Sequence, residues 1–271
     1  MRRNLIALGI AAMVALAGVS LAAAQSPYSV DGAPAVAPQT TSKGMAAIQR
    51  AAAADRYLFV FFWKERSQQT SAMWSAFQPV MSKVADNAES VVVNVSDPAE
   101  RPIVEKFGID RAPLPLVLAL APNGAITKAF PGKFDESQLP QAFVSPGMAK
   151  CLKALQARKL VLLCVQCRSP YVQQVSLQQG VADFAADARF AGATEIVSVD
   201  PVDPAEASFL QDLRVDPRSS TPVTVLLAPP GKAVGTFTGA VTKEELVAKL
   251  QSAQSSCCPG GKCGSGGCCQ H

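Results

Sequence analysis

The most reactive side chains in this sequence belong to eight cysteines and a single histidine. Two of the cysteines, Cys164 and Cys167, form a Cys-x-x-Cys pair directly after an apolar run. Such a pair carries out thiol–disulfide exchange when a helix N-terminus lowers the pKa of one thiol and the other resolves the mixed disulfide. The same two thiols can instead form a structural disulfide or stay buried and reduced. Cys164 and Cys167 are therefore candidate catalytic residues with two structural alternatives.

A second group of thiols lies among glycines in the C-terminal tail, residues 253–271. Thiolates at this density favour a soft metal such as Cu(I) or Zn(II), although their spacing is not that of a standard zinc finger. The alternative is disulfide formation, and with an odd number of cysteines one of them pairs with another chain, pairs with Cys151 or stays free. The candidate metal ligands are Cys257, Cys258, Cys263, Cys268, Cys269 and His271.

Two counts exclude broad classes of function. His271 is the only histidine and the last residue, so no folded domain of a single chain holds a Ser–His, Cys–His or His–metal site. The net charge of +4 over 271 residues lacks the basic footprint of a nucleic-acid-binding protein.

The N-terminus predicts export. Arg2 and Arg3 precede an apolar run over residues 5–21, and three alanines at 22–24 form a cleavage site, so residues 1–24 have the pattern of a signal peptide. The alternative is an uncleaved membrane anchor. We expect an exported protein of the periplasm, cell envelope or extracellular space, with no membrane span after cleavage. Residues 25–44, rich in Pro, Ser and Thr, predict a flexible leader.

The body of the chain predicts the same alternation of strands and helices twice, because continuous apolar runs alternate with segments of helical periodicity. The predicted strands are 57–63, 91–95, 116–120 and 125–130, then 159–163, 195–199, 223–227 and 233–237. The predicted helices are 45–54, 71–84, 99–107 and 136–143, then 171–186, 205–213 and 242–252.

An internal repeat supports a duplicated domain. Residues 96–100 (Ser-Asp-Pro-Ala-Glu) match residues 202–206 (Val-Asp-Pro-Ala-Glu), and residues 114–124 match residues 221–231. A repeat of this length indicates a duplicated domain rather than a solenoid unit. We therefore predict an α/β protein with one domain over residues 45–145 and another over residues 146–252.

The element order and the two segments that begin at Pro115 and Pro222 resemble the thioredoxin superfamily. The resemblance implies two tandem domains, each with a central sheet flanked by helices. It also implies that Pro115 and Pro222 are cis-prolines beside a Cys-x-x-Cys pair at the start of the first long helix, where they form candidate binding surfaces. In the first domain that pair would fall within residues 64–70 or at 71–74, and both stretches lack cysteine. In the second domain the usual loop length places the site at residues 168–171, after both thiols.

These observations favour a non-catalytic binding or scaffold protein. Its expected partners are extended peptides or envelope proteins, or another copy of the chain through an intermolecular disulfide. The alternative is a thiol–disulfide oxidoreductase that acts through Cys164 and Cys167.

Overall fold

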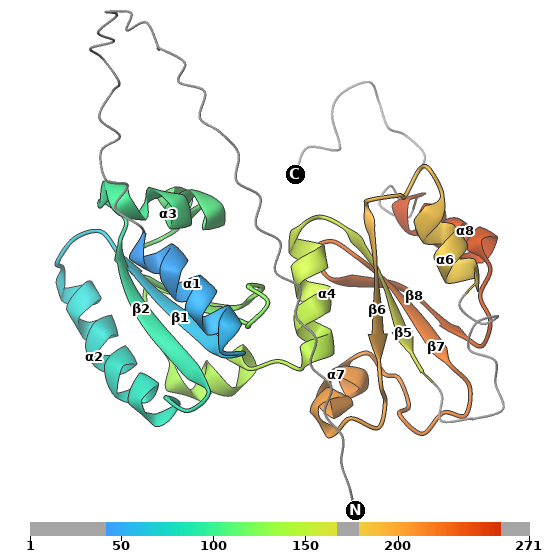
Figure 1. Cartoon of the computed structure of the whole chain (residues 1–271), viewed down its shortest axis with the longest axis horizontal. Coiled ribbons are helices and arrows are strands. Elements are labelled where there is room, and N and C mark those ends of the chain that lie inside the picture. The colour runs from blue at the N-terminus through green and yellow to red at the C-terminus, as the bar shows by residue number, and fades with distance from the viewer. Residues whose placement is uncertain (1–41, 167–178, 256–271) are drawn as a thin grey trace, which may run out of the picture. The chain divides into compact units, whose positions relative to one another are not determined.

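The computed structural model describes residues 42–166 and 179–255, which form two four-stranded sheets with helices on both faces (Figure 1). The strand order is β2-β1-β3-β4 in the first sheet and β6-β5-β7-β8 in the second. In each sheet the first two strands along the chain are parallel and the other pairings are antiparallel. The two units thus share one topology, which confirms the predicted fold class of two tandem α/β domains.

The first unit follows the predicted element order, and β1 and β3 have the predicted bounds. Helix α2 begins three residues earlier than predicted, because the hydroxyl of Ser67 accepts a hydrogen bond from the amide of Thr70 and caps the helix there. The elements are α1 (Lys43–Ala53), β1 (Tyr57–Trp63), α2 (Gln68–Lys83), β2 (Ala88–Asn94), η1 (Pro98–Glu100), α3 (Arg101–Phe107), η2 (Ile109–Arg111), β3 (Leu116–Leu120), β4 (Ile126–Pro131) and η3 (Glu136–Ala142).

The second unit begins with a helix that the sequence analysis did not predict, α4, which Ser145 caps and which has proline at its first position. Of the helix predicted over 171–186, the structure describes only the C-terminal half, α6. The elements are α4 (Pro146–Gln156), β5 (Leu160–Val165), α6 (Gln179–Ala186), β6 (Thr194–Val199), η4 (Pro204–Glu206), α7 (Ala207–Asp212), β7 (Val223–Ala228), β8 (Lys232–Thr238) and α8 (Lys243–Ser255). In the two described stretches, no helix is long and apolar enough to cross a membrane.

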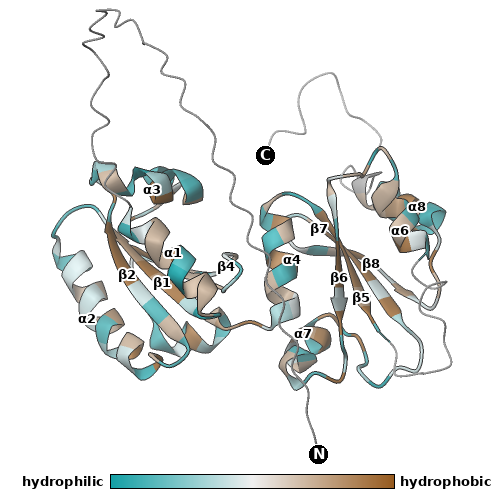
Figure 2. Cartoon of the chain, viewed as in Figure 1, coloured by the Kyte–Doolittle hydropathy of each residue, from teal (hydrophilic) through white to brown (hydrophobic). Residues whose placement is uncertain are grey.

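Each sheet is the middle layer of a three-layer core. Figure 2 shows that apolar residues are concentrated on the strands between the helices. In the first unit α1 and α3 pack on one face of the sheet, while α2 and η3 pack on the other. In the second unit α4 and α7 cover one face, and α6 and α8 cover the other. Strands buried on both faces account for the continuous apolar runs in the sequence.

A buried glutamate joins the first helix of each unit to the helix after its second strand. Glu100 is 3 % exposed and accepts hydrogen bonds from the Ser42 hydroxyl (2.6 Å) and from the amides of Lys43 (2.9 Å) and Gly44 (3.0 Å). These donors lie at the N-terminus of α1, where backbone N–H groups lack helical partners and the helix dipole favours a negative charge.

The second unit repeats this arrangement. Glu206 is 4 % exposed and accepts hydrogen bonds from the hydroxyl of Ser145 (2.5 Å) and the amide of Gly147 (2.6 Å). A Cβ atom at Gly147 would lie 2.6 Å from Val199 Cγ2 and 2.7 Å from Glu206 Oε2, so only glycine allows this close approach. The repeated Asp-Pro-Ala-Glu motif therefore has a structural role in both units.

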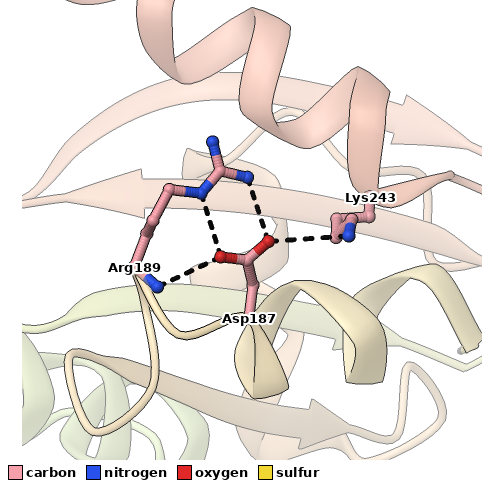
Figure 3. Close-up of polar contacts among 3 residues, drawn as sticks. All are labelled: Asp187, Arg189 and Lys243. Atoms are coloured by element: carbon pink, nitrogen blue, oxygen red, sulfur yellow. Dashed lines mark hydrogen bonds and ion pairs between the residues drawn. The ribbon is translucent and has the colours of Figure 1, made fainter.

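A charged cluster holds the C-terminal end of α6 near the N-terminal end of α8 (Figure 3). The Asp187 carboxylate accepts two hydrogen bonds of 2.9 Å from the Arg189 guanidinium and one of 3.1 Å from the Arg189 amide. Lys243 Nζ lies 3.5 Å from the same carboxylate. The hydrogen bonds from Arg189, with the Arg189 and Lys243 charges, hold the pKa of Asp187 well below its usual range.

Candidate functional site

In the first unit, two hydroxyls occupy the start of the long helix where the resemblance implies a pair of thiols. Ser67 is the N-cap of α2, and its Oγ lies 3.0 Å from Thr70 Oγ1. Thr70 gives its single hydroxyl proton to the carbonyl of Glu65 (3.0 Å), so Ser67 is the donor in the hydroxyl–hydroxyl bond. Of the two predicted placements, residues 64–70 therefore contain the helix start, and residues 71–74 lie inside α2.

The cis-proline predicted at position 115 is present beside this helix start. The Leu114–Pro115 peptide bond is cis, and the Pro115 carbonyl accepts a hydrogen bond of 2.7 Å from the Gly132 amide. The carbonyl of Gly132 accepts a 3.3 Å hydrogen bond from Gln69 Nε2, in the first turn of α2. Gly132 thus bridges the cis-proline and the first turn of the helix, and its φ of +69° suits glycine.

The second predicted cis-proline is wrong. The cis peptide bonds within the described residues are Leu114–Pro115 and Pro229–Pro230, so the bond before Pro222 is trans. The hydroxyl of Ser219 accepts a hydrogen bond from the Thr221 amide (3.1 Å) and donates one to the Thr221 carbonyl (2.7 Å). These two hydrogen bonds fix Thr221, the residue before Pro222. Among the described hydrogen bonds, Leu114, the residue before Pro115, has no equivalent pair.

The candidate catalytic residue Cys164 lies inside β5, opposite Ser198 on β6 and Thr224 on β7. It is 3 % exposed and belongs to the apolar core that α6 and α8 cover. Burial raises the pKa of the Cys164 thiol, and a hydrogen bond with Thr224 lowers it by a smaller amount. An attacking thiol requires the opposite conditions, namely exposure and a lowered pKa.

The rest of the second candidate site lies outside the described residues. Cys167 and residues 168–171 fall in that part of the chain, so their predicted roles stay predictions. The thiol of Cys164 lies within β5, which ends at Val165, and not at the start of a described helix. This position in the strand agrees with the structural alternative in which Cys164 is a buried thiol.

Within residues 42–166 and 179–255, Cys151 and Cys164 are free thiols, and no three Cys, His, Asp or Glu side chains cluster to hold a metal ion. Cys151 lies on α4 with 2 % exposure, and burial together with the charge of Glu206 raises its pKa to about 12. The candidate metal ligands of the tail fall outside these two stretches, and their role stays a prediction. They are Cys257, Cys258, Cys263, Cys268, Cys269 and His271.

The hydroxyl pair was not among the predicted site residues, although the sequence contains one signal for it. Ser67 and Thr70 have the Ser-x-x-Thr spacing of a capped first helical turn, directly before the helix predicted from residue 71. At this position the sequence analysis considered thiols only, and the sequence has none there.

Known proteins are similar to this chain in structure and not in overall sequence. No protein family model matches the sequence, and no curated protein matches it. A structure of the Drosophila melanogaster thioredoxin Deadhead is 18 % identical, covers 40 % of this chain and 93 % of its own, and has a TM-score of 0.31.

Two structures match over a longer part of the chain. The zinc-bound form of human ERp44 is 13 % identical, covers 81 % of this chain and 61 % of its own, and has a TM-score of 0.34. The first two thioredoxin domains of Saccharomyces cerevisiae Eps1p are 10 % identical, cover 81 % and 99 %, and have a TM-score of 0.28.

The assignment of the fold depends on the chain's own topology. Both sheets combine one parallel pair of strands with two antiparallel pairings and have helices on both faces, and the first sheet has a cis-proline before its third strand. With this element order, each of the two units has a thioredoxin-like α/β fold, and the described chain is a tandem of two such domains.

Proposed function

We propose that this chain is an exported, non-catalytic thioredoxin-like protein that binds other polypeptides. The hydroxyl pair of Ser67 and Thr70 at the start of α2 carries the proposal. A hydroxyl cannot form a disulfide, so the first unit lacks the nucleophile of thiol–disulfide exchange. Export is supported by the cationic start, apolar run and small residues of positions 1–24.

The alternative, an oxidoreductase that acts through Cys164 and Cys167, agrees with the fold but is opposed by the surroundings of Cys164. That thiol is buried inside a strand and has a raised pKa. Exchange through it would require the strand to open, because the attacking sulfur must reach a disulfide directly.

An insulin-reduction assay tests both statements. The wild-type protein with dithiothreitol should not exceed the uncatalysed rate. The double variant Ser67→Cys/Thr70→Cys should gain activity, because it places two thiols at a capped helix start with the spacing of a redox pair. A wild-type rate that disappears in Cys164→Ser/Cys167→Ser would establish the alternative instead.

We propose that the surface at Pro115 binds extended peptides or envelope proteins. The supporting features are the half-buried Leu114 before Pro115 and the exposed loop of residues 64–66. Peptide-array binding that falls in a Gly132→Val variant, which crowds Gln69 beside the cis-proline, would support this site. Equal binding by the variant would contradict it.

We also propose that the tail, residues 253–271, binds Cu(I) or Zn(II). Anaerobic titration of the reduced protein, with and without the tail, tests this proposal. Uptake that depends on the tail would support it. Thiols that are already oxidised, together with a dimer that disappears on reduction, would indicate disulfides and an intermolecular link instead.

A further inference from the structure

Two large apolar side chains are exposed on the outer strands of the two sheets. Val92 on β2 is 43 % exposed and Ile196 on β6 is 42 % exposed, and among the described strands each of these two has a neighbour on one side only. An edge strand offers unpaired N–H and C=O groups with which another extended chain can pair.

The hydrogen bonds of β5 show which groups of β6 face outward. The Leu160 amide donates to the carbonyl of Ala193 (2.8 Å), and the Gln166 amide donates to the carbonyl of Val199 (3.2 Å). Because successive residues of a strand alternate in direction, the main-chain groups of Thr194, Ile196 and Ser198 face away from β5.

In the first sheet an arginine closes the start of the corresponding edge. Arg56 lies 3.4 Å from Glu89, and its guanidinium also donates to the carbonyls of Ala85 and Ala88, the latter at 2.9 Å. Ala88 is opposite Tyr57 at the beginning of β2, so its outward carbonyl is already occupied. A charged side chain over an edge is a common way to prevent unwanted pairing.

The second sheet has a lysine where the first has this arginine. By strand register, Lys159, Thr194 and Glu195 correspond to Arg56, Ala88 and Glu89. Lys159 donates to Glu195 (3.0 Å), and among the described contacts it reaches no carbonyl of β6. An ammonium is a single point charge and lacks the fork of a guanidinium, so within the described residues Lys159 leaves this edge open.

Three lysines lie near one part of the open edge. One hollow is bordered by Asn123, by Lys150 and Lys153 of α4, by Lys159, and by Glu195 and Ile196 of β6. Lys153 also donates to the carbonyl of Gly124 (3.4 Å). Glu195, the acidic residue of this hollow, is paired with Lys159. The net positive charge of this hollow therefore complements an acidic segment, and Ile196 offers apolar contact.

We infer that the outer edge of β6 docks an extended polypeptide segment with acidic side chains. The segment pairs with the main chain at Thr194, Ile196 and Ser198, and its carboxylates lie close to Lys150. This surface is separate from the one at Pro115, and the two can be tested independently.

The test uses a fluorescent heptapeptide that alternates Glu and Val, with anisotropy measured against the full protein. A peptide that alternates Lys and Val tests charge, and the acidic peptide with alternate amides N-methylated tests strand pairing. We expect only the unmodified acidic peptide to bind. Lys150→Glu should weaken binding about fivefold or more, which corresponds to the loss of one favourable charge contact of about 1 kcal/mol.

The matched control is Lys83→Glu, which reverses an exposed lysine on α2 of the first unit and changes the net charge by the same amount. It should leave binding within twofold of the wild type. Equal binding by the N-methylated peptide, or no effect of Lys150→Glu, would overturn the inference. Self-association that blocks the peptide would also overturn it, because the edge would then hold a second copy of the chain.

Discussion

Replacing Glu100 with alanine should destabilise the first unit more than any exposed substitution nearby. The variant removes three hydrogen bonds to a buried carboxylate, from Ser42, Lys43 and Gly44. Hydrogen bonds to charged groups contribute about 1.5–3 kcal/mol each, but water can enter and recover part of this loss. We therefore expect the free energy of unfolding to fall by about 3 kcal/mol.

Urea denaturation followed by tryptophan fluorescence measures this effect in the first unit alone. Both tryptophans, Trp63 and Trp74, pack against the core between the first sheet and α2, so their emission does not report on the second unit. With a denaturant slope of about 2 kcal/mol per molar urea, the midpoint should fall by about 1.5 M.

A control on the helix that follows Glu100 separates this burial effect from loss of charge. Glu105→Ala removes an exposed carboxylate that pairs with Arg101 on the surface of α3. It should change the free energy of unfolding by less than about 0.5 kcal/mol, as expected of a surface ion pair. If the midpoints of Glu100→Ala and Glu105→Ala agree within error, the role assigned to the buried carboxylate is wrong. A cycle with Ser42→Ala measures the direct coupling between the two side chains.

Three further outcomes follow from the second unit. Gly180→Ala should destabilise it by about 1–3 kcal/mol, seen as a lower thermal midpoint by circular dichroism, because the new methyl group would overlap the carbonyl of Val241. Cys151 and Cys164 should resist iodoacetamide at pH 8 and react only in denaturant, which peptide mass spectrometry can show; fast native labelling would contradict their burial. Asp187→Asn should lower the urea midpoint at pH 7. Because the folded-state pKa of Asp187 is depressed, the difference from the wild type should shrink as the pH falls below about 4, and an unchanged difference at pH 3 would refute the assignment.

The sequence predicts the strands better than the helices. Residues 57–63 and 116–120 are continuous apolar runs, and burial on both faces of a sheet makes such runs unambiguous. Helix α4 was missed because Ser-Pro-Gly at its start resembles a turn. Its glycine is required by the close approach of Glu206, a tertiary contact that local sequence cannot show.

Tertiary contacts also limit what the sequence predicts about the candidate sites. The proline at 115 and the one at 222 occupy equivalent positions, yet one peptide bond is cis and the other trans. The difference accompanies the hydrogen bonds of Ser219 to Thr221, which depend on the path of the preceding loop. The absence of thiols from the first unit could be read directly from the sequence, whereas the burial of Cys164 required the strand register.

The Ser67–Thr70 pair also determines how a complex at the first unit would end. No mixed disulfide can form there, so a bound partner leaves by dissociation alone, at a rate that the redox poise of the compartment does not change. Replacing the resolving cysteine to trap a covalent intermediate, the usual way to capture clients of dithiol enzymes, therefore has no counterpart at this unit. Its clients would be recovered by photocrosslinking, and reductant would not release them.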